Sequence, residues 1–285
     1  MASILPEEYE WGICISHDVD HLGHKEHRFW EIIEFWVTCS IEVLRLRRSI
    51  LSYLKVIKNS FFTKKDSWDC VHEMCELDFK NSIPSTFFFA MNPGIGLKYD
   101  RDQAREKVKT IPFNFEVGVH GQFQDNEKEI KDEYATLYNM LHRRPRGIRM
   151  HYLKTHPNML KLLKTAGYEY DTTELDKSGG LKQAYKTPEG IVEIPVHLME
   201  TYLFSPFYEN LKLEKAIEKV EALIQKAKQD RKIINIIVHQ RSLSEDLPRQ
   251  RQFYQWLVER VSKDQKCWKA NCMKIAEKVN GNQNT

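Results

Sequence analysis

Short apolar and β-branched runs alternate with amphipathic segments along most of this 285-residue chain, and this alternation limits the folds open to it. Seven runs are predicted to be strands: 10–16, 85–91, 115–121, 147–152, 168–173, 191–199 and 233–239. Segment 213–232 places Ala216, Val220, Leu223 and Ile224 at helical spacing. The alternation predicts an α/β fold of parallel strands with right-handed crossovers. Seven such units fit a closed barrel or an open doubly wound sheet, and periodicity does not choose between them.

The composition excludes several classes of protein. A chain that is 41% hydrophobic and 29% charged suits a globular fold with a large core, and 11% aromatic residues argue against disorder. A net charge of +3 is too small for a nucleic-acid binder. The sequence has no uninterrupted apolar run of membrane-spanning length, and it opens without a basic-then-apolar signal segment. Because its six cysteines form no CxxC pair, we expect buried thiols and a cytoplasmic location.

One connection is too long for a single crossover helix. Residues 66–83 are predicted to form the helix before the second strand, which leaves about 22–60 as an insertion after the first strand. The insertion is aromatic, aliphatic and basic, so we expect a helical hairpin packed on a single domain that spans 1–285. Its basic residues leave peripheral membrane contact through 22–60 as a less favoured alternative. They are Arg45, Arg47, Arg48, Lys55 and Lys58.

Polar residues follow several strands at their carboxyl ends, where parallel α/β folds place their sites. The first strand runs into Ser16-His17-Asp18-Val19-Asp20-His21. Asp18 and Asp20 are two residues apart, so in an extended chain their side chains point the same way. Converging carboxylates repel unless a cation or an arginine lies beside them. This pair therefore indicates a charged partner.

Other strand ends add histidines. The third predicted strand ends at His120, the fourth carries Arg149 and His151, and the seventh ends at His239. An aspartate with two or three histidines is a common ligand set for zinc or a similar divalent ion. An adjacent His-Asp pair also occurs in metal-dependent phosphohydrolases, so His17-Asp18 makes this class of enzyme an alternative function. That reading is weak because such a pair sits on a helix, whereas this one follows a β-rich run.

In this order, the motifs resemble those of the NodB-homology polysaccharide deacetylases, closest to a divergent subgroup among surface-polysaccharide biosynthesis proteins. The resemblance runs from about residue 10 to 245 outside the insertion, through SHDVDH, STFFF, EVGVHGQF, GIRMHYL, AGYEYDTT, EIPVHLME and IIVHQ. It implies a distorted, TIM-like (β/α)7 barrel with a helical insertion after the first strand. It also implies a metal-dependent hydrolase that removes an N-acyl group, expected to be acetyl, from an amino sugar in a surface polysaccharide or its precursor.

The resemblance assigns catalytic roles to three residues. The family's first motif places the general base at Asp18 and a metal ligand at Asp20. Its third motif makes Arg149 the residue that orients the base. Its last motif makes His239 the acid that protonates the departing amine.

The family's second motif, HxxxH, is incomplete in this chain. His120 matches its first metal ligand, but the second position is Gln124, whose amide oxygen is a poor zinc ligand. We expect His151 to restore the missing ligand, with Gln124 or water as alternatives. The resemblance thus implies a divalent ion, expected to be Zn²⁺, held by Asp20, His120 and His151.

The expected partner is a carbohydrate or sugar-containing substrate. Glu200 falls where the family often keeps an acidic residue beside the site, and we place Glu200 and Tyr152 among the substrate-binding residues. His197 is either a ligand-facing or a packed histidine, and His17 or His21 could support the metal ligands. Two other functions stay open. The first is a hydrolase with the same fold that acts on another linear or cyclic C–N amide. The second is a metal-free carbohydrate-binding module, which stays an alternative because Gln124 replaces a metal-binding histidine.

Overall fold

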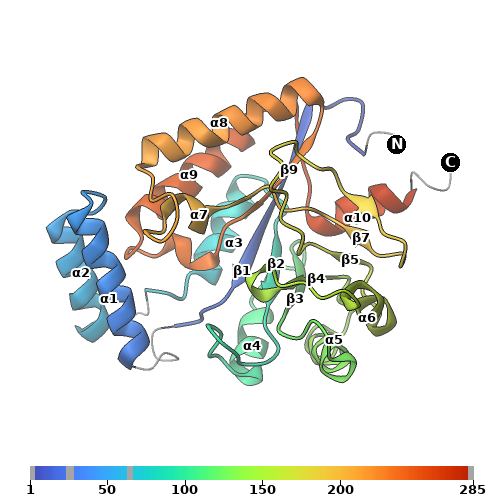
Figure 1. The fold of residues 1–285 in the computed structure, drawn as a ribbon, viewed down its shortest axis with the longest axis horizontal. Helices are drawn as coiled ribbons and strands as arrows, with labels where there is room; N and C mark the ends of the chain where they lie inside the picture. Colours follow the sequence, from blue (N-terminus) through green and yellow to red (C-terminus); the bar gives the residue numbers. More distant parts are fainter. Residues whose placement is uncertain (1–3, 24–28, 63–66, 282–285) are drawn as a thin grey trace.

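In the computed structural model, which describes residues 4–23, 29–62 and 67–281, a curved sheet lies inside a layer of helices (Figure 1). The strands are β1 (Trp11–Val19), β2 (Thr86–Phe89), β3 (Glu116–Gly121), β4 (Gly147–Met150), β5 (Tyr170–Asp171), β6 (Tyr185–Lys186), β7 (Val192–Glu193), β8 (Leu198–Met199), β9 (Ile233–Ile237) and β10 (Cys267–Lys269). Their order is β6-β7-β5-β4-β3-β2-β1-β9-β8, with β10 beside β1. The described pairs are parallel apart from β6 with β7.

Helices follow most of the strands, as the alternation predicted. The α-helices are α1 (Phe29–Leu44), α2 (Ile50–Phe62), α3 (Val71–Lys80), α4 (Arg101–Val108), α5 (Glu127–Leu141), α6 (Met159–Ala166), α7 (Glu200–Phe204), α8 (Leu213–Asp230), α9 (Pro248–Ser262) and α10 (Cys272–Gly281). There are two short 3₁₀ turns: η2 (His151–Leu153) follows β4 directly, and η3 (Gln240–Leu243) follows β9 after Val238 and His239. Both turns therefore begin at the carboxyl end of a strand, where a barrel site is expected.

Residues 191–199 close the sheet into a barrel. The first part of this segment, β7, pairs with β5, and the last part, β8, pairs with β9. Between them, the His197 amide donates to the Asn235 carbonyl of β9 at 2.9 Å. Pro195 has no N–H to donate, so the segment is two short strands instead of the single strand predicted. The expected distorted (β/α)7 barrel is confirmed.

Two short strands were not predicted. β6 forms an antiparallel hairpin with β7, and β10 pairs with the first residues of β1. The edge of β1 is shared, because β10 pairs with Trp11–Ile13 whereas β2 pairs with Ser16–Val19. Strands this short carry too few apolar residues to stand out by periodicity.

The core lies on both faces of the sheet. Phe87 and Phe89 of β2 pack in the large cluster beneath the helices, whereas Phe88 packs in a second cluster with Cys14 and Tyr170. Helix α10 contributes to this second cluster. Burial on both faces explains why β1, β2 and β9 read as near-continuous apolar runs.

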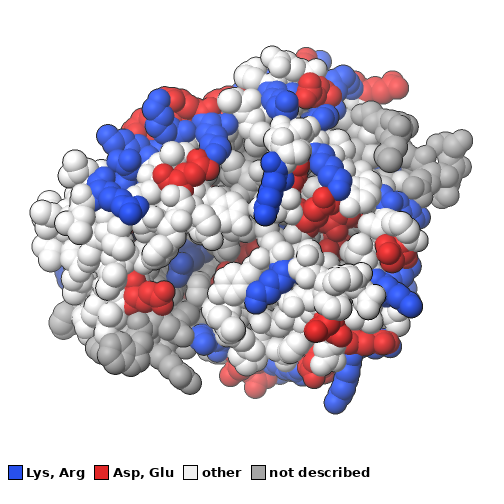
Figure 2. Space-filling view, viewed as in Figure 1, with Lys and Arg blue, Asp and Glu red and all other residues white. Residues whose placement is uncertain are grey.

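Helices α1 and α2 form the expected helical insertion, although residues 24–28 of it lie outside the described part of the chain. Arg48 ties the hairpin to the body, because its guanidinium donates to Glu42 at 2.7 Å and to the Asp246 carbonyl at 2.8 Å. The outer side of the hairpin leaves Leu44, Leu46 and other aliphatic side chains exposed, and this end of the molecule is largely white in Figure 2. Peripheral membrane contact through this surface stays a prediction. In the described ranges, no helix has the length and hydrophobicity needed to cross a bilayer.

The buried Glu133 of α5 is expected to make the stability of the fold depend on pH. Its side chain is fully buried, and burial raises its pKa to about 8, although the Gln122 amide donates to it. A folded-state pKa above the unfolded value means that stability is full below about pH 4.5 and falls as pH rises towards 8. We expect Glu133→Gln to remove this loss, which is on the order of 3 kcal/mol at pH 8. Urea unfolding of both proteins from pH 5 to 8 measures it.

The matched control is Glu127→Gln, an exposed position on the same helix. Other buried acids add to the pH dependence of the wild type, since burial also raises the pKa of Asp171 to about 6. The decisive quantity is therefore the difference between wild type and variant. Parallel stability curves for wild type and Glu133→Gln would contradict the prediction.

Candidate functional site

Charged and imidazole side chains from separate strands meet at one rim of the barrel. Asp18 lies in β1, Asp20 directly follows it, His120 lies in β3, Arg149 in β4, and His239 follows β9. Each stands at or near the carboxyl end of its strand. Parallel strands end at the same rim, so residues distant in sequence become neighbours there.

Three of these side chains form a cluster of possible metal ligands. His120 Nε2 lies 3.0 Å from His151 Nδ1 and 3.2 Å from Asp20 Oδ1. His151 Nδ1 lies 3.8 Å from the same Asp20 oxygen. In the described part of the chain, these are the His, Cys, Asp and Glu residues that could hold an ion together. One carboxylate and two imidazoles suit zinc or a related divalent ion.

The hydrogen bonds behind the cluster explain why it suits a cation. His120 Nδ1 faces the Arg149 carbonyl at 3.0 Å, and His151 Nε2 faces the Ile95 carbonyl at 3.0 Å. A carbonyl only accepts, so these outer nitrogens carry the protons and the inner nitrogens present lone pairs. The buried Asp20 Oδ1 accepts no hydrogen bond from the described residues. Three electron-rich atoms thus face one another, and a positive ion between them would relieve their repulsion.

The pKa shifts agree with this picture. Burial lowers the pKa of His151 to about 4, so this imidazole is neutral, as a metal ligand must be. Burial acts in the same direction on His120, but the carboxylates of Asp18 and Asp20 outweigh it and raise the His120 pKa. A positive charge is therefore favoured beside these carboxylates, and either a proton or a divalent ion supplies it.

Gln124 lies apart from this cluster. Its side-chain amide donates to the Gln122 carbonyl at 3.0 Å, and Gln124 is absent from the described residues that line the cavity. His151 instead approaches both Asp20 and His120. The geometry supports His151 over Gln124 as the third ligand.

Arg149 fixes Asp18 in its ionised form. The guanidinium is fully buried and donates to Asp18 Oδ1 at 2.7 Å and to Ser16 Oγ at 2.8 Å. It also stacks 4.5 Å from the ring centroid of Phe88. Burial alone would raise the pKa of Asp18, but Arg149 reverses this effect and lowers it. Asp18 is therefore a fixed carboxylate beside the candidate metal ligands.

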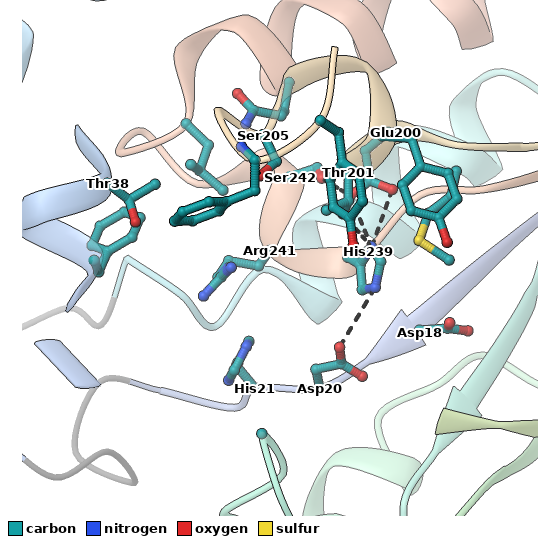
Figure 3. A pocket seen from close by; sticks show the side chains of 18 of the residues that line it. Asp18, Asp20, His21, Thr38, Glu200, Thr201, Ser205, His239, Arg241 and Ser242 are labelled. Carbon is teal, nitrogen blue, oxygen red and sulfur yellow. Dashed lines mark hydrogen bonds and ion pairs between the residues drawn. The ribbon is translucent and has the colours of Figure 1, made fainter. Parts of the chain in front are cut away.

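His239 and Glu200 form a second charged pair, and Figure 3 shows His239 between Glu200 and Asp20. His239 Nδ1 donates to Glu200 Oε1 at 2.9 Å, and its Nε2 lies 3.5 Å from Asp20 Oδ2. Burial disfavours the imidazolium, but the Glu200 carboxylate raises the pKa of His239 to about 10. Ser242 also donates to Glu200, which is buried. This geometry suits Glu200 to orienting His239 more than to direct substrate contact.

Tyr152 stands at the mouth of the site. It is 57% exposed and lines the cavity, so it remains a candidate for substrate contact. Its backbone is left-handed, with φ 57°, which is an uncommon conformation for a tyrosine. Gly96 approaches from the opposite loop with φ +80°, and an added Cβ there would lie 2.7 Å from the Tyr152 hydroxyl. A glycine at this position lets the loop carrying Ile95 reach His151.

The remaining histidines divide between support and packing. His17 is fully buried, and its ring nitrogens contact the Val238 carbonyl at 2.8 Å and Asp78 at 2.9 Å. It belongs to β1 and bonds away from the metal cluster, which argues against a phosphohydrolase His-Asp pair. His197 is a packed histidine held between the Asn235 amide and the Lys182 carbonyl. His21 lines the cavity, and His24 and His27 lie outside the described residues.

Sequence reasoning missed a group of cavity residues. Arg241 lies two residues after His239, and it projects into the cavity beside Trp68 and Phe35. Its closeness to His239 is a signal that could have drawn attention to it. The two rings could not be assigned in the same way, because they come from separate segments and carry no motif.

No family model matches this sequence, and no curated protein matches it. Solved structures, in contrast, match its fold over nearly the full length. A protein assigned as a polysaccharide deacetylase from Mycobacterium smegmatis is 19% identical, with a TM-score of 0.67 over 98% of this chain and 93% of the other.

Two further structures give the same result. A protein assigned as a polysaccharide deacetylase from Pseudomonas aeruginosa PAO1 is 15% identical, with a TM-score of 0.65 over 97% of this chain and 93% of the other. An allantoinase is 16% identical, with a TM-score of 0.61 over 97% of this chain and 92% of the other. The chain therefore has the distorted barrel of these hydrolases, as the resemblance predicted.

Proposed function

We propose that this protein is a metal-dependent hydrolase that removes an N-acyl group, acetyl in the first instance, from an amino sugar. One observation carries the proposal. The ligand cluster of Asp20, His120 and His151 lies between a fixed carboxylate, Asp18, and a protonated histidine, His239. Amide hydrolysis needs these parts on one rim: a base for water, an acid for the leaving amine, and a cation for the carbonyl.

Asp20, His120 and His151 would hold the divalent ion, for which we propose Zn²⁺ because two imidazoles and a carboxylate suit it. When bound, such an ion polarises the acyl carbonyl and lowers the pKa of water. The rest of the chemistry falls to side chains of this chain.

Asp18 accepts the proton of the attacking water. Arg149 keeps this carboxylate ionised and directed, since it donates to Asp18 Oδ1 and leaves Oδ2 facing His120 Nε2 at 3.9 Å. His239 presents Nε2 to the site, because its Nδ1 is bonded to Glu200. It donates that Nε2 proton to the amine nitrogen as the C–N bond breaks. Glu200 holds the ring in this orientation and stabilises its positive charge.

A second candidate function is hydrolysis of another C–N bond, such as that of a cyclic amide. The likeness to an allantoinase, with a TM-score of 0.61 over 97% of this chain, supports it. Both reactions use the same base, acid and ligand set. The aromatic lining of the cavity, including Trp68, Tyr152 and Tyr202, supports a sugar substrate, because aromatic faces pack against sugar rings.

We also propose that the protein works in the cytoplasm on a carbohydrate or a sugar-containing precursor of surface polysaccharide. All six cysteines are buried free thiols, which supports a reducing compartment. The two deacetylase-like structures support the carbohydrate.

Acetate release from the zinc-loaded protein tests the proposal. The substrates are N-acetylated glucosamine oligosaccharides, acetamido sugar phosphates and allantoin. We expect acetate from the acetamido sugars, its loss after chelation and its return on adding Zn²⁺. Allantoin hydrolysis without acetate release would select the second candidate. If the protein binds these sugars but hydrolyses none of the substrates with metal bound, it is a binding module and the proposal fails.

A further inference from the structure

The cavity over the candidate metal ligands is much larger than an acetyl group needs. It has a volume of about 850 Å³ and extends from Asp20 to helix α1 and the loop around Phe207. Figure 3 shows Thr38 of α1 on one side of it and Asp18 on the other. Much of this cavity is therefore lined by residues that take no part in the proposed chemistry.

The buried acids along this cavity have partners of opposite charge. Asp18 pairs with Arg149 at 2.7 Å, Glu200 with His239 at 2.9 Å, and Glu42 with Arg48 at 2.7 Å. Asp20 faces the imidazoles of His120 and His151. The remaining acid of the lining, Glu34, is exposed at the α1 side and pairs with no base among the described residues.

Arg241 has no such partner. Within residues 4–23, 29–62 and 67–281, its guanidinium forms no ion pair or side-chain hydrogen bond. It lies 4.7 Å from the ring centroid of Trp68 and 5.8 Å from that of Phe35. Stacking holds the plane of the guanidinium but uses none of its five N–H donors. Figure 3 shows Arg241 inside the pocket, between Thr38 and His239.

The backbone that carries Arg241 is firmly placed. Its neighbour Gln240 is fully buried, accepts from the Cys70 amide at 3.0 Å and donates to the Trp68 carbonyl at 3.2 Å. These bonds join η3 to the segment that presents the Trp68 ring. Burial also lowers the pKa of Arg241, with only partial relief from Asp20 and Glu200. A charged, preorganised donor at this position is costly to desolvate unless an anion meets it.

We propose that the substrate carries an anionic group, a carboxylate or a phosphate, which binds Arg241 while the acylated nitrogen of the substrate lies at the candidate metal ligands. Both groups present paired oxygens that match the two parallel N–H donors of a guanidinium. The substrate would then be an acidic amino sugar or an amino sugar phosphate. This inference rests on the proposed function for the position of the acyl group, but the binding of the anion by Arg241 does not depend on catalysis.

Matched substrates test the inference. Values of kcat/KM for acetate release are compared for N-acetylglucosamine, its 1-phosphate, its 6-phosphate and the corresponding uronic acid. We expect wild type to prefer at least one anionic sugar over the neutral one by about 10- to 100-fold, the usual effect of a charge-assisted pair of hydrogen bonds. Arg241→Gln should abolish this ratio, and Arg241→Lys should keep part of it. The phosphate and uronate arms identify the source of the anion.

The matched control is Arg105→Gln, at an exposed position on α4, which should keep the wild-type ratio. A second measurement separates the two proposals. Binding of the same sugars to the metal-free protein is followed by tryptophan fluorescence, to which Trp68 contributes. If no acetate is released but anionic sugars bind about tenfold tighter than neutral ones and Arg241→Gln removes the difference, only the proposed function fails. Equal binding of neutral and anionic sugars, or a folded Arg241→Gln with an unchanged ratio, overturns the inference.

Discussion

Replacing Asp20, His120 or His151 by alanine is expected to reduce bound metal from about one equivalent per chain to less than about 0.1. Each substitution removes one of only three protein ligands. A remaining imidazole cannot turn to compensate, because the Arg149 carbonyl holds His120 and the Ile95 carbonyl holds His151 in one orientation. Metal analysis of the purified variants after dialysis against trace chelator measures the effect. Acetate release should be lost in parallel.

Gln124→Ala and Asp18→Asn are the controls for the metal prediction. Gln124 bonds to the Gln122 carbonyl away from the cluster, and Asp18 is held by Arg149, so both variants should keep the wild-type metal content. Full metal content in both Asp20→Ala and His120→Ala would show that the cluster is not the site. If His151→Ala retains metal while Gln124→Ala loses it, the third ligand is Gln124.

Asp18→Asn and His239→Asn are each expected to lower kcat for amide hydrolysis by about 10²- to 10⁴-fold, the range usual for a general base or acid. Asparagine keeps the approximate shape of aspartate but cannot take a proton from water. At position 239 it cannot protonate the leaving nitrogen. The measurement is acetate release at saturating substrate, with circular dichroism to confirm the fold.

The two variants should differ on an acetyl ester. An alkoxide leaves with less help from an acid than an amine does, so His239→Asn should hydrolyse the ester with a smaller loss than the amide. Asp18→Asn should impair both substrates, since each needs activated water. Glu200→Gln should resemble a milder His239→Asn, because Glu200 holds the proton-bearing ring through Nδ1. Wild-type amide hydrolysis by both Asp18→Asn and His239→Asn would contradict the acid–base scheme.

Much of the fold could be predicted from local pattern. The seven apolar runs correspond to β1, β2, β3, β4, β5, β9 and the segment containing β7 and β8. The helices at 71–80 and 213–230 fall inside the segments 66–83 and 213–232 predicted for them. Periodicity succeeds here because strands buried on both faces need long apolar runs, and surface helices need one apolar stripe.

The candidate site followed from the same logic for a reason of topology. Carboxyl ends of parallel strands share one rim, so Asp20, His120 and His239 could be placed together before any coordinates. The role of Glu200 could not be foreseen in this way. Its burial and its bond to His239 depend on how α7 packs against η3, and that contact has no local signature.

The sequence by itself determined the strand–helix alternation, the parallel strand arrangement and the strand-end positions of Asp18, Asp20, His120, Arg149 and His239. These depend on periodicity and on the order of residues along each strand, which are local properties. Tertiary structure alone decided that 191–199 closes the barrel between β5 and β9, and that His151 approaches Asp20 while Gln124 does not. It also decided that Arg241 stacks on Trp68 and forms no ion pair with an acid of the described residues. Such contacts join segments far apart in the chain, and their energies depend on backbone positions that only the complete packing defines.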